Sequence, residues 1–487
     1  MDGTDATDPG EPTATDGDGD GDSRSGSGSG PREGSRDRPG DGDGPADGAD
    51  AGRGSPYRRR WLGYGLLALA FFLVSLHRTS TAVLSEGLLD AFEMTATGLG
   101  LLHSSFFYLY AALQVPAGLL TDRYGARAIA AGGTGLMSAG AVAFGLAPAY
   151  RVAFLGRLLV GLGASVVFVA TLRFCANWFR PDEFGTMTGV TFTVAVFGGL
   201  AATTPLAVAI ESVGWRATLL GIGGVGLAAA VGIAALAHDT PRAAGLPPVE
   251  EVPDRPAVSA AELRGHTLAA LREPETWLLG VMMFFMTGIG ITVFGLWGIP
   301  YLVQTYGVPV TEASLYLLVG SVGGMVGPTA FGWLSDQLGR RTELIVVSAV
   351  VFGLTWGVFA AFRSVPLLLV GGIFLFSRTL RGGIPLAFAV VKERNPEAAS
   401  GTVIGIVNTM GWTGAAVFPV VLGAALDAFW TGETVNGSRV YTALGYRVAF
   451  GIALAGGLVA AACAVGLHLR VRRERRTGER APDAAAE

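Results

Sequence analysis

Five arginines lie inside strongly apolar stretches of the sequence, at positions Arg78, Arg157, Arg173, Arg378 and Arg381. A charged side chain inside a membrane costs free energy unless it is paired or reaches water, so such residues commonly mark solute pathways. A guanidinium group presents a planar fork of donors that matches a carboxylate or a phosphate. No Asp or Glu lies near the centre of any of these stretches. The arginines therefore predict a binding site for an anion and argue against a cationic solute.

Arg78 is the best placed of the five for contact with a solute. It lies 17 residues beyond Trp61, which corresponds to about 25 Å along a helix. Thr81 and Ser85 share its helical face. A charge in this position needs a partner, and an incoming anion supplies one. The alternative is a structural role, in which the arginine extends its head to the membrane surface or holds the backbone by hydrogen bonds.

The other four arginines differ in the direction in which they point. Arg378 and Arg381 are three residues apart and share a helical face. Arg157 and Arg173 lie 16 residues apart on one expected helix, so they point about 160° apart and do not face the same site. We predict solute contacts for Arg157, Arg378 and Arg381, with the same structural alternative. Arg173 is expected near the cytoplasmic end, as a gate residue or reaching the surface.

Further side chains are candidates for completing the site. His77 precedes Arg78 and can titrate near neutral pH, although a merely packed histidine is equally consistent with the sequence. The polar and aromatic candidates are Tyr108, Gln114, Trp297, Tyr301, Asn408 and Trp412. Each of these can equally belong to helix packing or to an aromatic belt at the membrane surface. The two cysteines are expected to be free thiols, and no metal or cofactor site is predicted.

A motif of glycines and charges occurs twice and is a candidate gate. The first copy consists of Gly118, Asp122, Arg123, Gly125 and Arg127, and the second of Gly332, Asp336, Gly339, Arg340 and Arg341. Glycine permits close helix approach, which we predict for Gly118, and tight turns, which we predict for Gly125. A charge cluster of this kind can hold one conformation closed and release it in another. The alternative is that these charges only mark a solvated loop.

The elements that must position these residues are helices long enough to cross a membrane. The chain has 487 residues, of which 50% are hydrophobic and only 15% are charged, whereas soluble proteins carry about 25% charged residues. Apolar segments of roughly 20 residues, the length that spans a bilayer, occupy 61–84, 97–120, 127–147, 152–174, 187–209, 217–237, 277–301, 313–334, 343–362, 366–390, 401–425 and 447–469. We therefore predict an all-α membrane protein with twelve transmembrane helices.

The twelve segments form two parallel repeats of six. The two motif copies are offset by 336 − 122 = 214 residues, and Gly214-Trp215-Arg216 has its counterpart in Gly445-Tyr446-Arg447. Two such repeats are typical of transporters, with the solute site at their interface near mid-membrane. The predicted units are a disordered acidic tail at 1–56, a six-helix bundle at 57–238, a cytoplasmic linker at 239–275, a second bundle at 276–472 and a C-terminal tail at 473–487.

Arginine placement predicts the orientation of the helices. Basic residues gather in alternate connections, including the run Arg58 to Arg60 before the first segment and the run Arg470 to Arg476 after the last. Basic residues flanking transmembrane helices favour the cytoplasmic side. Both termini are therefore expected in the cytoplasm, in a multi-pass protein of the cell membrane.

The motif copies carry a resemblance to a known family. The pattern G-x-L-x-D-R-x-G-x-R, formed here from Gly118 to Arg127 and echoed from Gly332 to Arg341, resembles the signature of the major facilitator superfamily. Arg157, Gly161 and Gly163 look like its R-x-x-x-G-x-G element. The resemblance covers roughly 57–472. It implies a twelve-helix transporter with a gate at the motif and a solute site between the bundles.

Two anion-transporting branches of that superfamily are similar in part. Arg78 lies 44 residues before Asp122 and resembles the first-helix arginine of the organophosphate/phosphate antiporters, but 277–301 holds no counterpart of their second arginine. The arginines of the first and fourth helices also resemble those of the anion:cation symporters for sugar acids. Where those symporters carry acidic residues, this chain has His77 and small apolar residues such as Ala164. The usual carboxylates of proton coupling are therefore missing.

Together these features predict a secondary active transporter of a small organic anion, a carboxylate, sugar acid or phosphate-like solute, and not an enzyme. Its partners are the anionic solute, the lipid bilayer and a coupling proton or an exchanged anion, without nucleic acid, and we expect a monomer. An exporter of neutral or hydrophobic compounds and a transporter-like solute sensor remain alternatives.

Overall fold

The computed structural model describes residues 56–247, 260–394, 397–435 and 438–477. The predicted acidic tail lies outside these residues apart from Pro56, and so do parts of the predicted linker and C-terminal tail. Residues 54–487 belong to one compact unit. Within the described residues this unit is helical apart from one short hairpin.

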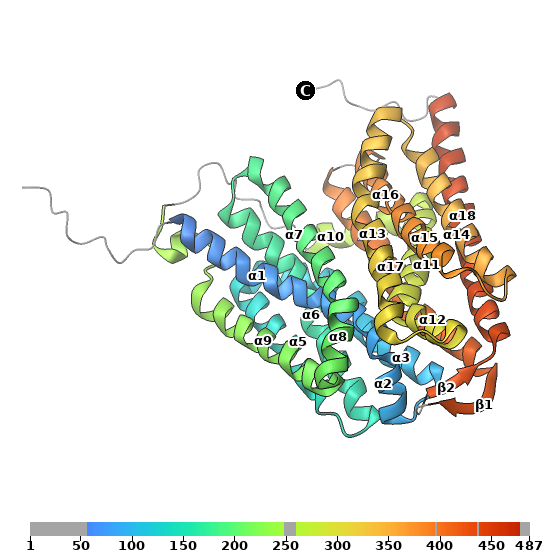
Figure 1. Cartoon of the computed structure of the whole chain (residues 1–487). Coiled ribbons are helices and arrows are strands. Elements are labelled where there is room, and N and C mark those ends of the chain that lie inside the picture. Colours follow the sequence, from blue (N-terminus) through green and yellow to red (C-terminus); the bar gives the residue numbers. More distant parts are fainter. Residues whose placement is uncertain (1–55, 248–259, 395–396, 436–437, 478–487) are drawn as a thin grey trace, which may run out of the picture. The chain divides into compact units, whose positions relative to one another are not determined.

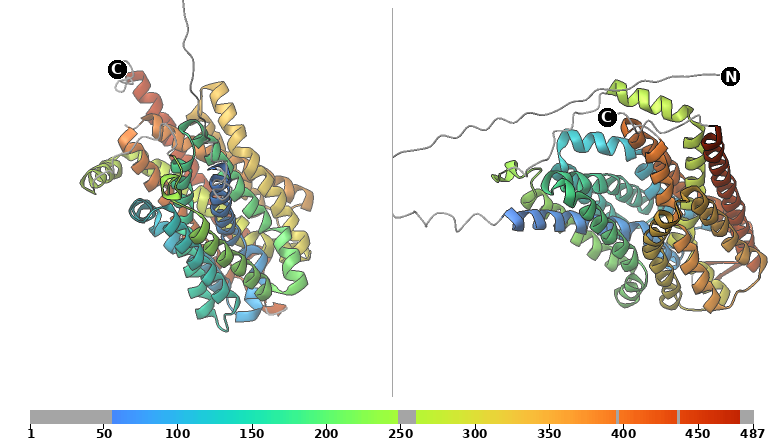
Figure 2. Two further views of the ribbon diagram at one scale, coloured as in Figure 1. Left: turned by 90° about the vertical axis from the view of Figure 1, so that its left-hand side faces the viewer. Right: turned by 90° about the horizontal axis from the view of Figure 1, so that it is seen from above.

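The first half of the chain, α1 to α9, covers the first six predicted segments. Its helices are α1 (Pro56–Thr79), α2 (Thr81–Phe92), α3 (Ala96–Ala112), α4 (Gln114–Tyr124), α5 (Ala126–Gly145), α6 (Tyr150–Trp178), α7 (Pro181–Ala201), α8 (Thr204–Val213) and α9 (Trp215–Leu236). The views in Figures 1 and 2 show α1 in blue beside the green helices, and it contacts α6, α7 and α9.

A connection leads from there to the second half, α11 to α18. The connection contains a 3-10 turn (Arg242–Ala244) and α10 (Ala260–Arg272). The second half contains α11 (Pro274–Thr292), the π-helical turn η2 (Val293–Trp297), α12 (Gly298–Tyr306), α13 (Val310–Leu338), α14 (Arg341–Ala361), α15 (Leu367–Leu380), α16 (Gly383–Arg394), α17 (Glu397–Asp427), β1 (Trp430–Val435), β2 (Ser438–Tyr441) and α18 (Ala443–Thr477). The antiparallel hairpin, with Trp430 opposite Tyr441, was not expected from the sequence.

Eleven helices of the described residues are long and apolar enough to cross a membrane. The predicted segment 97–120 is not among them, because it is built from two shorter helices, α3 and α4. These helices meet at Leu113, which has a backbone conformation outside the helical region. This set of helices is therefore that of a multi-span membrane protein. The number of twelve crossings stays a prediction.

Prolines explain four of the interruptions in the predicted segments. A proline has no N–H for the carbonyl four residues earlier, and its ring crowds that carbonyl. The last residues of α3, α7, η2 and α15 lie three to five residues before Pro116, Pro205, Pro300 and Pro385 respectively. Interrupted helices expose backbone groups, which membrane proteins tolerate where the groups are satisfied by the protein or line a solute path.

The internal repeat is visible in equivalent backbone contacts of the two halves. Arg216, at the start of α9, donates from Nη1 to the carbonyl of Ala147 at 2.7 Å, just beyond the C-terminal end of α5. Its counterpart Arg447, near the start of α18, donates from Nε to the carbonyl of Ala360 at 2.9 Å, at the C-terminal end of α14. In both halves the arginine thus satisfies an otherwise free carbonyl of a helix end.

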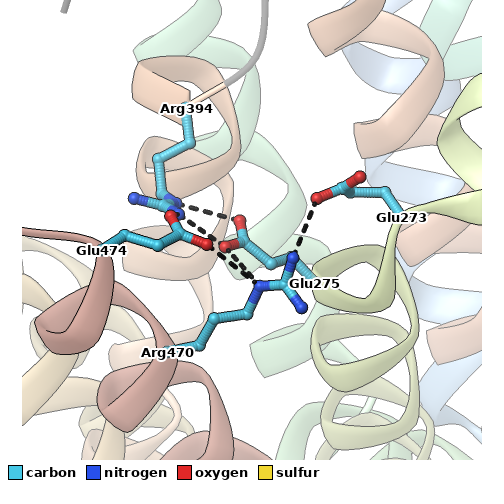
Figure 3. A network of polar contacts seen from close by, with 5 residues as sticks. All are labelled: Glu273, Glu275, Arg394, Arg470 and Glu474. Carbon is cyan, nitrogen blue, oxygen red and sulfur yellow. Dashed lines mark hydrogen bonds and ion pairs between the residues drawn. The ribbon is translucent and has the colours of Figure 1, made fainter. Parts of the chain in front are cut away.

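An ion-pair network joins three helix ends of the second half (Figure 3). Arg394 of α16 donates from Nε to Glu275 of α11 at 2.9 Å and also pairs with Glu474 of α18. Arg470 of α18 contacts Glu273, Glu275 and Glu474. Since Glu275 is only 5% exposed, these pairs fix the relative positions of α11, α16 and α18 more firmly than surface pairs would.

The two halves meet closely along α3 and α17. A Cβ added at Gly100 of α3 would lie 2.4 Å from the carbonyl oxygen of Pro419 in α17, and one added at Gly423 would lie 2.6 Å from the carbonyl oxygen of Ala96. Glycine at these two positions permits the approach of the two backbones. We call the end of the molecule with α2, α8 and the β-hairpin the hairpin end, and the end with Asp122 and Asp336 the motif end.

Candidate functional site

Three of the predicted arginines come together between the halves. Arg78 lies at the C-terminal end of α1, Arg378 lies on α15, and Arg381 follows the last residue of α15. Each side chain is partly buried. The end of α1 lies against η2, since a Cβ added at Gly295 would be 3.8 Å from the carbonyl oxygen of Arg78, and Arg378 packs on the ring of the neighbouring Phe294. All three lie beside interruptions of helices, which is a usual arrangement around solute sites in transporters.

Aromatic rings and glycines hold these guanidinium groups. The guanidinium of Arg78 lies 5.4 Å from the ring centroid of Trp412 on α17, and that of Arg378 lies 4.9 Å from the ring of Phe294 in η2. Arg381 packs against Gly290 of α11, where an added Cβ would lie 3.0 Å from Nη1. None of the ion pairs among the described residues includes Arg78, Arg378 or Arg381. The cluster is therefore positively charged without a protein counter-ion in that part of the chain.

Aromatic and amide side chains of α3 and α4 contact α17 next to the arginine cluster. Tyr110 packs edge-on to Trp412 at 4.8 Å, and Phe107 stacks on the same ring at 6.0 Å. Gln114 accepts a hydrogen bond from Nδ2 of Asn408 at 3.3 Å, across the two halves. Gln114 also donates to the carbonyl of Tyr110 at 3.2 Å. The structure thus places Gln114 and Asn408 together, as neighbours of the ring that covers Arg78.

Arg157 does not join this cluster. Its side chain is 1% exposed and donates from Nη1 to the carbonyl of His77 at 2.8 Å and from Nη2 to Oγ1 of Thr81 at 2.9 Å. These two acceptors flank Ser80, where α1 ends and α2 begins. Arg157 therefore holds the broken first segment together, which is the structural alternative that the sequence left open. His77 is 2% exposed beside it, away from solvent in this conformation.

The aromatic candidates lie in different places. Tyr108 is 37% exposed, whereas Tyr110, two residues further along α3, is buried and packs on Trp412. A solute contact of Tyr108 stays a prediction. Tyr301 packs on Phe359, Tyr446 and Phe450 within the second half, and its hydroxyl lies 3.2 Å from that of Tyr306. Trp297 is 3% exposed in η2, and no hydrogen bond of its Nε1 is found among the described residues.

One residue that the sequence analysis missed is His103 on α3. It is fully buried, and neither ring nitrogen has a hydrogen-bond partner among the described residues. Its ring lies against the position of Gly295 in η2, where an added Cβ would be 3.2 Å from Cε1. His103 therefore lies in the contact between the halves. The sequence around His103 does not mark it as a site residue, because a lone histidine in an apolar stretch is more simply explained by helix packing.

The first copy of the predicted gate carries its charges at the motif end. Asp122 pairs with Arg173 of α6 at 3.5 Å, and both side chains are largely exposed. Arg127 donates from Nε to the carbonyl of Ala234 at 2.9 Å, at the end of α9. Gly125 has φ +84°, which confirms the predicted tight turn. Arg123 lies on the exposed surface beside the ring of Tyr124.

The second copy has a similar arrangement in the other half. Arg341 contacts Asp336 at 3.4 Å and pairs with Glu393 of α16. Arg340 pairs with Glu343 at 3.6 Å, and Gly339 ends α13 with φ +63°. The prediction that Gly118 allows close helix approach is wrong for this structure, since a Cβ at Gly118 would meet nothing within 4 Å. The close approach between helices of the two halves instead occurs at Gly100 and Gly423.

Polar contacts close the hairpin end between the halves. Asp427, at the end of α17, accepts hydrogen bonds from the backbone N–H of Ala96 at 2.9 Å and of Thr97 at 2.8 Å, and from the hydroxyl of Thr97 at 2.5 Å. Its carboxylate thereby caps the N-terminal end of α3, where the helix dipole favours a negative charge. Ser314 of α13 donates to Thr204 of α8 at 3.0 Å. Burial raises the pKa of Glu86, on α2 at the same end.

We expect Asp427→Asn to open the hairpin end more often. The amide keeps one acceptor but places an NH2 group against the N–H groups of α3, which costs about 1–2 kcal/mol and corresponds to about a 5- to 30-fold shift. The measurement is the labelling rate of Cys introduced at buried Ser314, in a chain with Cys175 and Cys463 replaced by Ser. Glu433→Gln, in the exposed part of the hairpin, is the matched control. Equal labelling rates in the parent and Asp427→Asn would contradict the closing role.

The described residues contain no group of three or more His, Cys, Asp or Glu side chains that is arranged to hold a metal ion. The site is thus one of cations and aromatic rings. Such a set binds anions by charge and planar hydrogen bonding.

Comparison with known proteins identifies the family of this chain and several similar proteins. The sequence model of the Major Facilitator Superfamily matches residues 67–328 and again 282–486. The chain is 24% identical to a probable sulfoacetate transporter of Cupriavidus necator over 76% of this chain and 88% of that protein. It is 25% identical to the hexuronate transporter of Bacillus subtilis, over 79% and 91% of the two chains. It is 26% identical to a membrane sensor protein of Salmonella typhimurium, over 76% and 85%.

The fold has solved counterparts. A bacterial homologue of the human lysosomal transporter Spinster, in an inward-facing and occupied conformation, superposes with a TM-score of 0.69 at 19% sequence identity. The match covers 85% of this chain and 97% of that protein. At this level of identity the likeness concerns the fold alone.

Proposed function

Because this chain belongs to the Major Facilitator Superfamily, we propose that it is a secondary active transporter that carries a small organic anion across the membrane. The single observation that supports this most is the meeting of Arg78, Arg378 and Arg381 without a counter-ion among the described residues. Three unpaired cations between two helical halves are costly unless an anion binds there. The relatives named for sulfoacetate and hexuronate carry the same kind of solute.

We propose that the two halves rock about this cluster in an alternating-access cycle. The hairpin end is closed by Asp427 on α3 and by the contact of Ser314 with Thr204. In the opposite state these contacts break, and the halves come together at the motif end. There Asp122, Asp336 and their arginine partners lie on both halves and can exchange partners. Uptake measured with and without a pH gradient distinguishes proton coupling from exchange of a second anion.

A solute sensor is the second candidate, because one relative is a membrane sensor protein of similar length. A sensor binds the same anion but does not carry it. An exporter of neutral compounds is the third candidate, and the unpaired arginines argue against it. Counterflow separates these three, since a sensor shows binding without exchange and an exporter of neutral compounds ignores anions.

The proposed topology places twelve crossings in two units, 57–238 and 276–472, with both termini and the linker 239–275 in the cytoplasm of a cell-membrane protein. Reporter fusions at Gly30 and after Arg476 should then read as cytoplasmic. Cys at Gly432 in the hairpin, in a chain without native cysteines, should react with an impermeant reagent on intact cells. The topology would be contradicted if the hairpin reacts with the impermeant reagent and a reporter at either terminus also lies outside the cell.

We expect Asp122→Asn to reduce transport about tenfold without lowering the melting temperature. Its ion pair with Arg173 has side chains that are 60% and 45% exposed, and exposed pairs contribute only about 0–1 kcal/mol to stability. The loss of transport follows from the proposed motif-end contact in the other state, which needs the negative charge. Initial uptake rates in proteoliposomes measure it, with exposed Asp182→Asn of α7 as control. Unchanged uptake in Asp122→Asn would remove Asp122 from the gate.

The experiment that tests the function is uptake and counterflow with the purified chain in proteoliposomes. The panel contains carboxylates, sugar acids, sulfonates and phosphate esters, each with and without a pH gradient, and neutral sugars for comparison. Saturable exchange of at least one anion is expected. Saturable transport of neutral compounds only would overturn the proposal.

A further inference from the structure

We infer that the solute carries two separate anionic groups and binds across the two halves, with one group on Arg78 and the other on the pair of Arg378 and Arg381. This inference rests on the proposed function, since it specifies which anion the same site accepts. It follows from how the three cations are divided between the halves, from the different rings that pack on them, and from the absence of an ion pair to any of them among the described residues.

The three arginines form two cationic centres. Arg378 and Arg381 lie three residues apart at the C-terminal end of α15, in the second half. Arg78 belongs to α1 of the first half. Different neighbours hold the two centres, with Trp412 over Arg78 at 5.4 Å and Phe294 over Arg378 at 4.9 Å. A solute that neutralises both centres must therefore extend from one half to the other.

The number of charges also favours two anionic groups. No described residue forms an ion pair with any of the three arginines, and no hydrogen bond of Nε in Arg378 or Arg381 is found there. A single carboxylate or sulfonate would leave two cations unmatched. Two anionic groups leave only one cation unmatched. A planar guanidinium group can bind each anionic group through two parallel hydrogen bonds.

This division of charge also couples binding to the movement of the halves. Like charges repel, so Arg78 and the α15 pair oppose an approach of the halves that brings them closer together. An anion bound at one centre removes only part of that repulsion. An anion with a group at each end instead attracts both centres to itself, so it binds the occluded state better than the open one. A ligand shifts a conformational equilibrium only through such a difference in affinity.

The test compares two-ended anions with analogues that carry a single anionic group, using the full-length protein in detergent for binding and in proteoliposomes for exchange. Succinate is compared with its monoamide succinamate, and sulfoacetate with methanesulfonate and acetate. Glycerol 3-phosphate represents a dianion with a single anionic centre. We expect succinate or sulfoacetate to bind at least about 50-fold more tightly than its single-group analogue, as is usual when one partner of a desolvated charge pair is lost.

Variants assign the two ends of the solute. Arg78→Gln should bring the affinity ratio of the two-ended anion to its single-group analogue close to one, and Arg378→Gln combined with Arg381→Gln should do the same. Arg363→Gln, in the exposed connection before α15, is the matched control and should keep the ratio of the parent. The ratio is informative even if absolute affinities fall, because both anions are measured on the same protein.

Two results are decisive against the inference. Single-group anions or glycerol 3-phosphate that bind as tightly as the two-ended anions would overturn it, while transport of organic anions would still stand. Failure of every anion to exchange, together with uptake of neutral compounds, would overturn the proposed function and the inference with it.

Discussion

Arg78→Ala is expected to weaken binding of the exchanged anion at least about 100-fold, or about 3 kcal/mol, and to abolish its transport. The reason is that Arg78 is the first half's only member of the arginine cluster. Its contacts within the protein are weak, namely a hydrogen bond to Oγ of Ser75 at 3.3 Å and the ring of Trp412. The variant should therefore keep its melting temperature, because little of the fold depends on this side chain.

Arg78→Lys separates charge from geometry. Lysine keeps the positive charge but loses the planar fork, so it cannot form two parallel hydrogen bonds to a carboxylate. We expect an affinity between those of the parent and Arg78→Ala. Equilibrium binding in detergent and counterflow in liposomes measure both variants, with the anion that exchanges best in the parent. Parent-like exchange by both variants would make Arg78 structural and would remove the main support for an anionic solute.

Arg157→Met is expected to have the largest effect on stability, lowering the free energy of unfolding by about 3 kcal/mol. The side chain is nearly fully buried and bridges the carbonyl of His77 to the hydroxyl of Thr81. Methionine fills similar space but donates no hydrogen bond, so it leaves a buried carbonyl with less compensation at the end of α1. Arg157→Lys should be intermediate, because one ammonium group does not reproduce both contacts.

The melting temperature of the purified protein without solute measures this effect. Arg363→Gln serves as the control for loss of an arginine from an exposed position. A parent-like melting temperature in Arg157→Met, together with lost anion binding, would return Arg157 to the solute site. Arg78 and Arg157 thus have opposite expected phenotypes, although both are arginines in apolar segments of the same half.

This contrast shows where prediction from the sequence stops. Hydropathy and length locate the apolar segments well, because bilayer thickness sets the length of a spanning helix. The spacing of Arg378 and Arg381 predicts a shared helical face, and the structure places Arg381 one residue beyond the end of α15. The sequence does not separate Arg78 from Arg157, since the role of Arg157 depends on a break at Ser80 that no proline marks.

Other differences have similar physical causes. Tyr108 and Tyr110 are two residues apart and point to different faces of α3, and the sequence alone does not say which face meets the other half. Gly118 was expected in a close helix contact, but an added Cβ would meet nothing within 4 Å there. The breaks near Pro116, Pro205, Pro300 and Pro385 carry a visible signal, because a proline removes the backbone bond four residues earlier.

The small number of polar contacts at the hairpin end limits how much these contacts contribute to the stability of this conformation. Three hydrogen bonds to Asp427 and one between Ser314 and Thr204 join the halves there, and at about 1 kcal/mol net each they contribute about 4 kcal/mol. Reversing a population ratio from 1:99 to 99:1 takes about 5.5 kcal/mol of differential binding. The two quantities are comparable, so in the proposed cycle a solute that binds one state more tightly is sufficient to change which state most molecules adopt.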